Sequence, residues 1–256
     1  MASLSVIVIT KNEAHDIGAC IDSVSWADEI IVLDSGSTDG TQDICREKNV
    51  QLYETDWPGF GKQKQRALAK ASCDWVLSLD ADERVSPELR KVIEKMLAQP
   101  KESLLHGYEI RRENYFCGYR IKHQKLWANN FITRLVQNGK AYFDDLPIHE
   151  NLHIAEGEKL GLIKESLIHY SYRDYEEALA KMNSYTTVEA SERVYKYKKI
   201  NLKSACFHSF WSFMRNYFFK KGFLDGRAGF FLCCYMAQVT YSRHIKMMLL
   251  KNNKQD

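Results

Sequence analysis

Leu77-Ser78-Leu79-Asp80-Ala81-Asp82 is an apolar run that ends in two acidic residues spaced one apart. Two earlier apolar runs of similar length, Val6–Thr10 and Ile30–Asp34, also end in polar residues. Continuous apolar strands are typical of parallel sheets that are covered on both faces. In such sheets, ligands bind outside the carboxyl ends of the strands. The sequence therefore predicts one crevice, at three strand ends, for a nucleotide and a metal ion.

Residues 1–100 alternate between strand and helix patterns, which predicts an α/β fold with a doubly wound sheet. We expect strands at residues 5–10, 29–34, 51–54 and 75–80, and helices near 17–23, 41–48, 62–71 and from Pro87 onward. Shorter, irregular strands are expected at 108–112, 131–136, 140–143 and 160–169, where they could build the acceptor side of a cleft. After residue 172 the pattern is helical.

The charge of the chain is unevenly distributed. Residues 194–256 hold 12 Lys and Arg against two Asp, whereas residues 1–193 hold 24 basic and 31 acidic residues. A basic, aromatic-rich tail on an acidic body favours an anionic partner, either nucleic acid or an anionic membrane. The alternative is a charged helical face that is merely solvated.

The seven cysteines form no C-x-x-C pair, which argues against a disulfide framework and a zinc site and favours a reducing compartment. The first strand lacks the preceding basic region of a signal peptide. The longest uncharged run, residues 228–242, is shorter than the ~20 residues of a spanning helix. We expect a cytoplasmic protein that rests on a membrane.

The first two strand ends carry candidate nucleotide-binding residues. Thr10, Asn12 and Glu13 offer a hydroxyl, an amide and a carboxylate that can hold the edge of a base and its ribose. Asp34 can accept hydrogen bonds from base or ribose hydroxyls. Lys62 and Arg66, spaced i, i+4 on one helix face, could face a diphosphate.

Asp80 and Asp82 are the candidate metal-binding residues. In an extended segment, residues i and i+2 point the same way, so both carboxylates can address one cation. Mg²⁺ and Mn²⁺ prefer carboxylate, phosphate and water oxygens. We favour Asp82 as the direct ligand of a cation that neutralises a departing nucleoside diphosphate. Taken singly, each Asp could instead be a turn or helix cap.

A second acidic cluster spans residues 144–150 and contains Asp145, His149 and Glu150. An inverting group transfer needs one base to take a proton from the attacking hydroxyl, and Glu150 and Asp145 are the candidates. His149 could hold the acceptor or a phosphate. Arg134 and Trp127 could line the same cleft, although the cluster alone also fits a polar turn.

Together these motifs resemble the family 2 glycosyltransferases with a GT-A fold, a Rossmann-like nucleotide-diphospho-sugar transferase domain. The superfamily resemblance rests on residues 5–13, 34–41 and 80–82. Further motifs are similar to the lipopolysaccharide core β-1,4-glucosyltransferase branch, namely residues 60–66, 134–136, 146–150 and 221–226. The resemblance covers nearly the whole chain. It implies a GT-A domain over 1–172, divided into nucleotide-sugar-binding (1–100) and acceptor-binding (101–172) halves, and a basic helical C-terminal extension over 173–256.

The resemblance also implies a UDP-sugar donor, UDP-glucose, with inversion at the anomeric carbon and Mn²⁺ or Mg²⁺ as cofactor. Asp34 and residues 10–13 would contact the nucleoside, and Asp82 the metal-bridged diphosphate. The acceptor would be an inner-core heptose of a lipid-linked oligosaccharide. The basic tail then fits a cytoplasmic, peripheral enzyme on the anionic inner face of the inner membrane, with no nucleic-acid partner. Many relatives place the base in a Glu-Asp pair, whereas this chain has His149-Glu150.

Three alternatives remain at this point. One is a family 2 transferase that moves another UDP-sugar onto a different cell-envelope glycan. A second is a sugar-nucleotide pyrophosphorylase, although residues 10–13 are not the Gly- and Arg-rich loop that such an enzyme needs. The third is a non-catalytic nucleotide-binding module that anchors a basic tail to membrane or nucleic acid.

Overall fold

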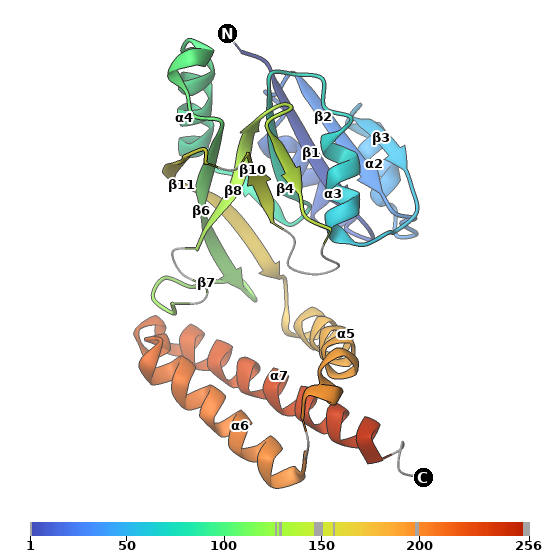
Figure 1. Ribbon diagram of the computed structural model, residues 1–256, viewed down its shortest axis with the longest axis vertical. Helices are drawn as coiled ribbons and strands as arrows, with labels where there is room; N and C mark the ends of the chain where they lie inside the picture. Colours follow the sequence, from blue (N-terminus) through green and yellow to red (C-terminus); the bar gives the residue numbers. More distant parts are fainter. Residues whose placement is uncertain are drawn as a thin grey trace. The chain divides into compact units, whose positions relative to one another are not determined.

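The computed structural model describes residues 2–125, 127, 130–145, 151–155, 157–197 and 200–252, and it forms two compact units (Figure 1). The N-terminal unit comprises residues 1–112 and 130–169, and the C-terminal unit comprises residues 113–129 and 170–256. The sequence led us to expect one domain up to residue 172, with the helical extension after it. The structure differs in that residues 113–129 belong with the C-terminal helices.

Four parallel strands with level carboxyl ends form the first half of the sheet, in the order β3-β2-β1-β4. In the register of the ladders, Thr10 lies opposite Asp34, and Ile9 lies opposite Asp80. The polar residues that follow β1, β2 and β4 therefore emerge at one edge, as predicted. The strands are β1 (Leu4–Thr10), β2 (Glu29–Asp34), β3 (Gln51–Glu54) and β4 (Trp75–Asp80).

Antiparallel pairing extends the sheet beyond β4, so that the complete sheet is mixed. Strand β8 pairs antiparallel with β4, and β6, β11 and β5 follow in that order, with β7 beside β6. A separate pair is formed by β9 and β10. These strands are β5 (Glu83–Val85), β6 (Gly107–Phe116), β7 (Tyr119–Arg120), β8 (Asn130–Gln137), β9 (Ala141–Phe143), β10 (Leu152–Ile154) and β11 (Leu160–Tyr172).

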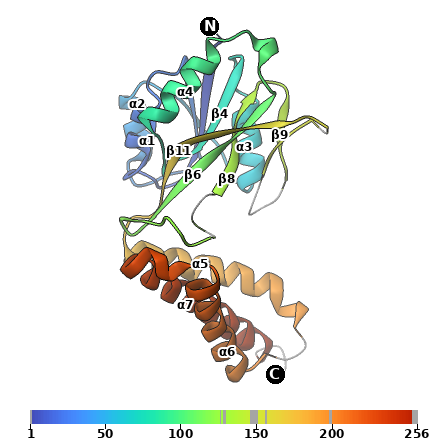
Figure 2. The same cartoon turned by 90° about the vertical axis from the view of Figure 1, so that its left-hand side faces the viewer.

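Alternate residues of β1 pack into two separate hydrophobic cores, one on each face of the sheet. Leu4, Val6 and Val8 pack with residues of α1, α2 and α4, whereas Ile7 and Ile9 pack with residues of α3. Figure 2 shows α1 and α4 on one side of the sheet and α3 on the other. The strands are continuously apolar because helices bury both faces of the sheet. The helices are α1 (Ile17–Ser23), α2 (Thr41–Glu47), α3 (Phe60–Leu68) and α4 (Pro87–Leu97), and the 3₁₀ turn η1 (Lys101–Ser103) follows α4.

The C-terminal unit is built from helices, of which two are capped by side chains. Asp174 accepts a hydrogen bond from the Glu177 N–H (2.8 Å), and Asn201 accepts one from the Ser204 N–H (2.8 Å). The elements are α5 (Tyr175–Arg193), η2 (Val194–Lys196), α6 (Leu202–Met214), the π-helical turn η3 (Arg215–Phe219), η4 (Gly222–Asp225) and α7 (Gly226–Asn252).

Two interactions explain why residues 113–129 join this unit. The Asp225 carboxylate accepts hydrogen bonds from the backbone N–H groups of residues 122–124, at 2.8–3.1 Å. The buried Phe116 ring packs against Trp127, Tyr172 and Tyr235. Trp127, which we considered as a cleft residue, is therefore part of an aromatic core.

Candidate active site

The loops after β1 and β2 are joined by hydrogen bonds at the carboxyl edge of the sheet. The Asn12 N–H donates to Ser37 Oγ (2.8 Å), and the Thr38 N–H donates to Asn12 Oδ1 (2.9 Å). The Glu13 N–H donates to Thr41 Oγ1 (2.9 Å). The structure therefore brings two of the predicted nucleotide-binding residues, Asn12 and Glu13, against the loop that follows Asp34.

Asp34 is fully buried, and its carboxylate organises this loop by accepting hydrogen bonds from it. Its Oδ1 accepts hydrogen bonds from the Gly36 N–H (3.0 Å), the Ser37 N–H (2.9 Å) and Gln42 Nε2 (2.6 Å). Its Oδ2 accepts one from Ser37 Oγ. The contacts of Asp34 thus shape the loop, and direct contact with a nucleoside remains a prediction.

Thr10 lies beside Asp34 in the sheet and is 3% exposed. Its backbone carbonyl accepts a hydrogen bond from the Ser35 N–H (3.0 Å). Its hydroxyl, by contrast, finds no hydrogen-bond partner among the residues that the structure describes. A buried hydroxyl without a partner is costly, so a ligand group that reaches it would gain a hydrogen bond.

A chain of ion pairs crosses the end of β4. Lys64 Nζ lies 2.6 Å from one Asp80 carboxylate oxygen, and Arg134 Nη2 lies 2.5 Å from the other. The same Arg134 nitrogen lies 2.9 Å from Glu83 Oε1, and Glu83 Oε2 accepts a hydrogen bond from the Asp80 N–H (3.0 Å). The chain Lys64–Asp80–Arg134–Glu83, hereafter the ion-pair chain, joins α3, β4, β8 and β5.

The ion-pair chain holds Asp80 as a carboxylate. Burial on its own would raise the pKa of the Asp80 carboxyl, but the charges of Arg134 and Lys64 outweigh it and hold that pKa well below its usual range. Both Asp80 oxygens thus face cations of the protein itself. Arg134, expected as a cleft residue, is instead almost fully buried in this chain. Sequence reasoning missed Lys64, which lies between the predicted Lys62 and Arg66 on α3, and Glu83, which directly follows the predicted pair.

Asp82 has a different neighbour. Its Oδ2 lies 3.3 Å from His169 Nε2 on β11, and the two side chains are 18% and 14% exposed. The register pairs His169 with Glu83, which brings β11 alongside the turn after β4. His169 was not predicted, although the sequence shows a His at the end of an expected strand.

This pair fits a divalent cation only in part. A carboxylate oxygen suits Mg²⁺ or Mn²⁺, and a neutral imidazole is a common metal ligand. Within the described ranges, no group of three or more His, Cys, Asp and Glu side chains is placed to hold a metal ion. Asp82 and His169 would therefore need oxygens from a bound ligand to complete the coordination of a cation.

The remaining predicted residues lie on α3 and in the segment after β9. Lys62 Nζ lies 3.4 Å from Asp145 Oδ2, and both side chains are exposed. Arg66 pairs with Asp56 (2.6 Å). The structure thus places Lys62, which we predicted to bind the diphosphate, beside Asp145, which we predicted as a candidate base. His149 and Glu150 lie outside the described residues.

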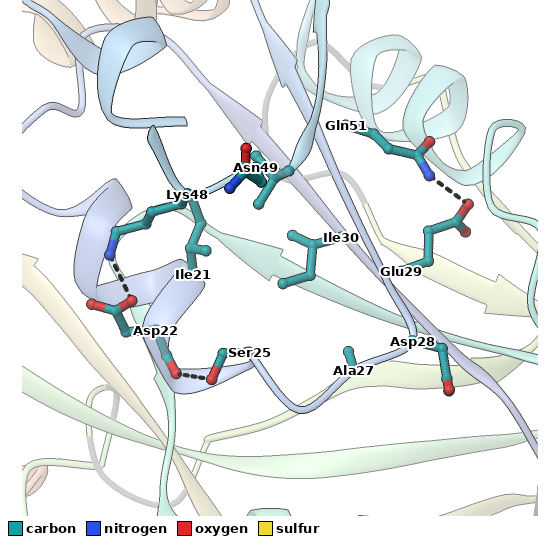
Figure 3. Close-up of a pocket in the computed structure, with 11 residues that line it drawn as sticks. Ile21, Asp22, Ser25, Ala27, Asp28, Glu29, Ile30, Lys48, Asn49 and Gln51 are labelled. Atoms are coloured by element: carbon teal, nitrogen blue, oxygen red, sulfur yellow. Dashed lines mark hydrogen bonds and ion pairs between the residues drawn. The ribbon is translucent and has the colours of Figure 1, made fainter. Parts of the chain in front are cut away.

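A surface hollow of about 460 Å³ lies at the amino end of β2, opposite the candidate active site (Figure 3). Four of its polar side chains pair with one another, since Lys48 pairs with Asp22 (2.6 Å) and Gln51 donates to Glu29 (3.2 Å). We assign no ligand to it.

The ion-pair chain predicts a large effect of Arg134→Met on stability. Removal of one partner from a buried ion pair costs about 3–5 kcal/mol, because the other charge stays buried. Glu83, whose side chain is fully buried, would then keep the more distant Arg112, whose Nη1 lies 3.8 Å from Glu83 Oε1, as its ion-pair partner among the described residues. We expect the free energy of unfolding, measured by urea denaturation, to fall by that amount.

Arg66→Met is the matched control, because its ion pair with Asp56 is exposed and such pairs contribute about 0–1 kcal/mol. The effect of Arg134→Met should also depend on pH. Since the pKa of Asp80 is lowered, its contribution is complete above the unfolded-state pKa of about 3.9 and declines below it. Equal small losses in both variants would contradict the structural role of Arg134.

Comparison with known proteins identifies a family and several relatives to which this chain is similar. The family model "Glycosyl transferase family 2" matches residues 5–153. The lipopolysaccharide core biosynthesis glycosyltransferase LpsC of Rhizobium meliloti is 30% identical over 94% of this chain and 93% of its own length. An uncharacterized glycosyltransferase of Rickettsia bellii is 30% identical over 89% of this chain and 80% of its own length.

Among solved structures, glucosyl-3-phosphoglycerate synthase from Mycobacterium tuberculosis, in complex with Mn²⁺, UDP and glucosyl-3-phosphoglycerate, is 27% identical. The match covers 44% of each chain with a TM-score of 0.37.

The matched family region contains the described loops after β1, β2 and β4 as well as the ion-pair chain. The chain is therefore an enzyme, which sets aside the pyrophosphorylase and the non-catalytic module. The predicted fold class, an α/β GT-A domain with a C-terminal helical extension, is confirmed. By its family match and its similarity to LpsC, the chain belongs to glycosyltransferase family 2.

Proposed function

We propose that this enzyme transfers glucose from UDP-glucose onto an inner-core heptose of a lipid-linked lipopolysaccharide precursor, with inversion at the anomeric carbon. The observation that carries the donor site is the level edge of β1, β2 and β4, where Thr10, Asn12 and Asp82 emerge together. The acceptor class is supported by the 30% identity to LpsC over nearly the full length of both chains. A different UDP-sugar and cell-envelope glycan would use the same site.

In this proposal the nucleoside binds over the joined loops after β1 and β2. The buried Thr10 hydroxyl gains a partner in the ligand, and Asn12 and Glu13 contact the base and ribose. Asp34 contributes mainly by holding the loop, because its oxygens already accept three hydrogen bonds from the loop and one from Gln42 of α2. The pre-formed loop lowers the entropy cost of binding.

The diphosphate lies toward β4 and α3. Asp82 and His169 would hold a Mn²⁺ or Mg²⁺ ion, which supplies positive charge for the departing diphosphate. Lys62, on the exposed face of α3, adds a cation on the same side. Asp80 remains bound to Lys64 and Arg134 and keeps the turn that carries Asp82 in place.

The second substrate is activated by a carboxylate from residues 144–150. Glu150 takes the proton from the attacking acceptor hydroxyl, whose oxygen then bonds to the anomeric carbon on the face opposite the departing UDP. Asp145 is the second candidate for this base. His149 would hold the acceptor.

The donor site is tested by ligand-induced stabilisation of the purified chain. A ligand that binds only the folded state raises the melting temperature in proportion to the logarithm of its concentration over its Kd. We expect UDP-glucose to raise it more with Mn²⁺ than without, and GDP- and ADP-sugars to have little effect. Asp82→Ala should lose the metal-dependent part while its ligand-free melting temperature stays unchanged.

Asp43→Ala is a suitable control, since this exposed carboxylate on α2 pairs with the exposed Arg46 of the same helix. It should retain the full metal-dependent shift. If Asp82→Ala also retains it, the metal assignment fails. If UDP-galactose or another UDP-sugar gives the largest shift, the mechanism stands and the donor changes.

The base is tested by comparing Glu150→Gln with Asp145→Asn in a transfer assay on a deacylated, heptose-terminated acceptor. Loss of a general base lowers the rate by about 10²–10⁴-fold. We expect Glu150→Gln to lower kcat in this range and to leave the KM for the donor nearly unchanged. A larger loss in Asp145→Asn would assign the base to Asp145, and unchanged rates in both would refute a base in this segment.

A further inference from the structure

Helix α6 faces α7 with small and polar side chains. Ala205, Ser212 and Asn216 are the buried residues of α6 and its π-helical continuation η3. The hydroxyl of Ser209 donates to the Ala237 carbonyl of α7 (2.9 Å), and Thr240 Oγ1 lies 3.1 Å from Ser212 Oγ. Close approach through small residues and hydrogen bonds across the interface therefore hold these two helices together.

The other face of the same helix carries large aromatic side chains that are exposed. In a water-soluble protein, an amphipathic helix normally buries its apolar face and exposes its polar face. Here the pattern is reversed over α6 and η3 and continues onto η4 and the start of α7. We define the aromatic face as the eight residues, each 46–66% exposed, Phe207, Phe210, Trp211, Phe218, Phe219, Phe223, Leu224 and Phe230.

Ring contacts connect several members of this face, directly or through neighbouring rings. Trp211 and Phe219 have their ring centroids 5.9 Å apart. The half-buried rings of Phe213 and Tyr217 both contact Phe230, at 5.6 and 5.8 Å. Single exposed apolar residues are ordinary, whereas connected apolar surfaces mark interaction sites.

Cations surround the aromatic face. Lys203, Arg215 and Arg227 are exposed on the same elements, and the exposed Lys221 directly precedes η4. Asp225 is the one acidic residue in the sequence between 194 and 255, and its carboxylate is occupied by the backbone N–H groups of residues 122–124. Over residues 194–255 the sequence thus combines apolar rings with a net positive charge.

This combination fits a bilayer better than a second copy of the chain. A symmetric dimer through this face would bring the same cations against one another. Helices that contact each other through small and polar residues and turn apolar residues outward are typical of apolar surroundings. Interfacial helices place aromatic and Leu side chains among the acyl chains and Lys or Arg at the headgroups. None of the helices in the described residues has the length and apolar composition needed to cross a bilayer.

We propose that the aromatic face inserts into the surface of an anionic lipid bilayer, and that the aromatic side chains, more than the lysines, hold the protein there. The inference stands on α6, η3, η4 and α7 alone and does not depend on which sugar is transferred. The cations attract the protein to anionic headgroups, and the rings provide the apolar area that is buried on insertion.

The test is sedimentation of the full chain with vesicles of phosphatidylcholine containing phosphatidylglycerol. We expect the triple variant Phe207→Ser, Phe210→Ser and Phe218→Ser to bind at least tenfold more weakly, with an unchanged melting temperature because these side chains are exposed. The matched control is Leu162→Ser, which removes a 61% exposed apolar side chain from the N-terminal unit and should bind as the unaltered chain does.

Fluorescence quenching by lipids brominated on their acyl chains tests insertion directly. Trp211 belongs to the aromatic face, so vesicles of brominated lipid should quench the unaltered chain, and Trp211→Phe should abolish that quenching. Equal vesicle binding by the triple variant and the unaltered chain would overturn the proposal. A dimer in light scattering that the triple variant converts to monomer would overturn it as well, in favour of a second copy.

Discussion

The ion-pair chain Lys64–Asp80–Arg134–Glu83 is the interaction on which the candidate active site depends. It joins one helix and three strands of the N-terminal unit at the point where parallel strands give way to antiparallel ones. Charges in a protein interior are tolerated only when each has a partner, so the four side chains fix one another's positions. These contacts anchor the turn after β4, and Asp82 in that turn lies beside His169.

The two acidic residues at the end of β4 therefore have different tasks. Asp80 balances two buried cations and supports the turn, whereas Asp82 lies beside an imidazole that can share a ligand with it. A similar division holds after β2, where Asp34 organises the loop and the neighbouring Thr10 hydroxyl stays without a partner in the described residues. In both places one group forms the structure, and we propose that its neighbour contacts the substrate.

Much of this site follows from local sequence patterns, and the remainder depends on contacts between distant segments. Strands that end in Thr10, Asp34 and Asp80 could be predicted because apolar runs and their polar ends are continuous in the sequence. Lys64, Arg134 and His169 could not be assigned, because their partners lie 16, 54 and 87 positions away and only the sheet order brings them together. The outward aromatic face of α6 was hidden for a similar reason, since its 3.6-residue period does not reveal which side faces α7.

The most direct test of the donor site is the uptake of Mn²⁺ in the presence and absence of UDP, followed by the electron paramagnetic resonance signal of free Mn²⁺. Asp82 and His169 are too few to hold the ion without further ligands, so the diphosphate should complete its coordination. We expect the protein alone to leave the signal unchanged, and protein with UDP to remove more free Mn²⁺ than UDP does by itself. Tight uptake without UDP, or no additional uptake with it, would contradict a donor site built at this edge of the sheet.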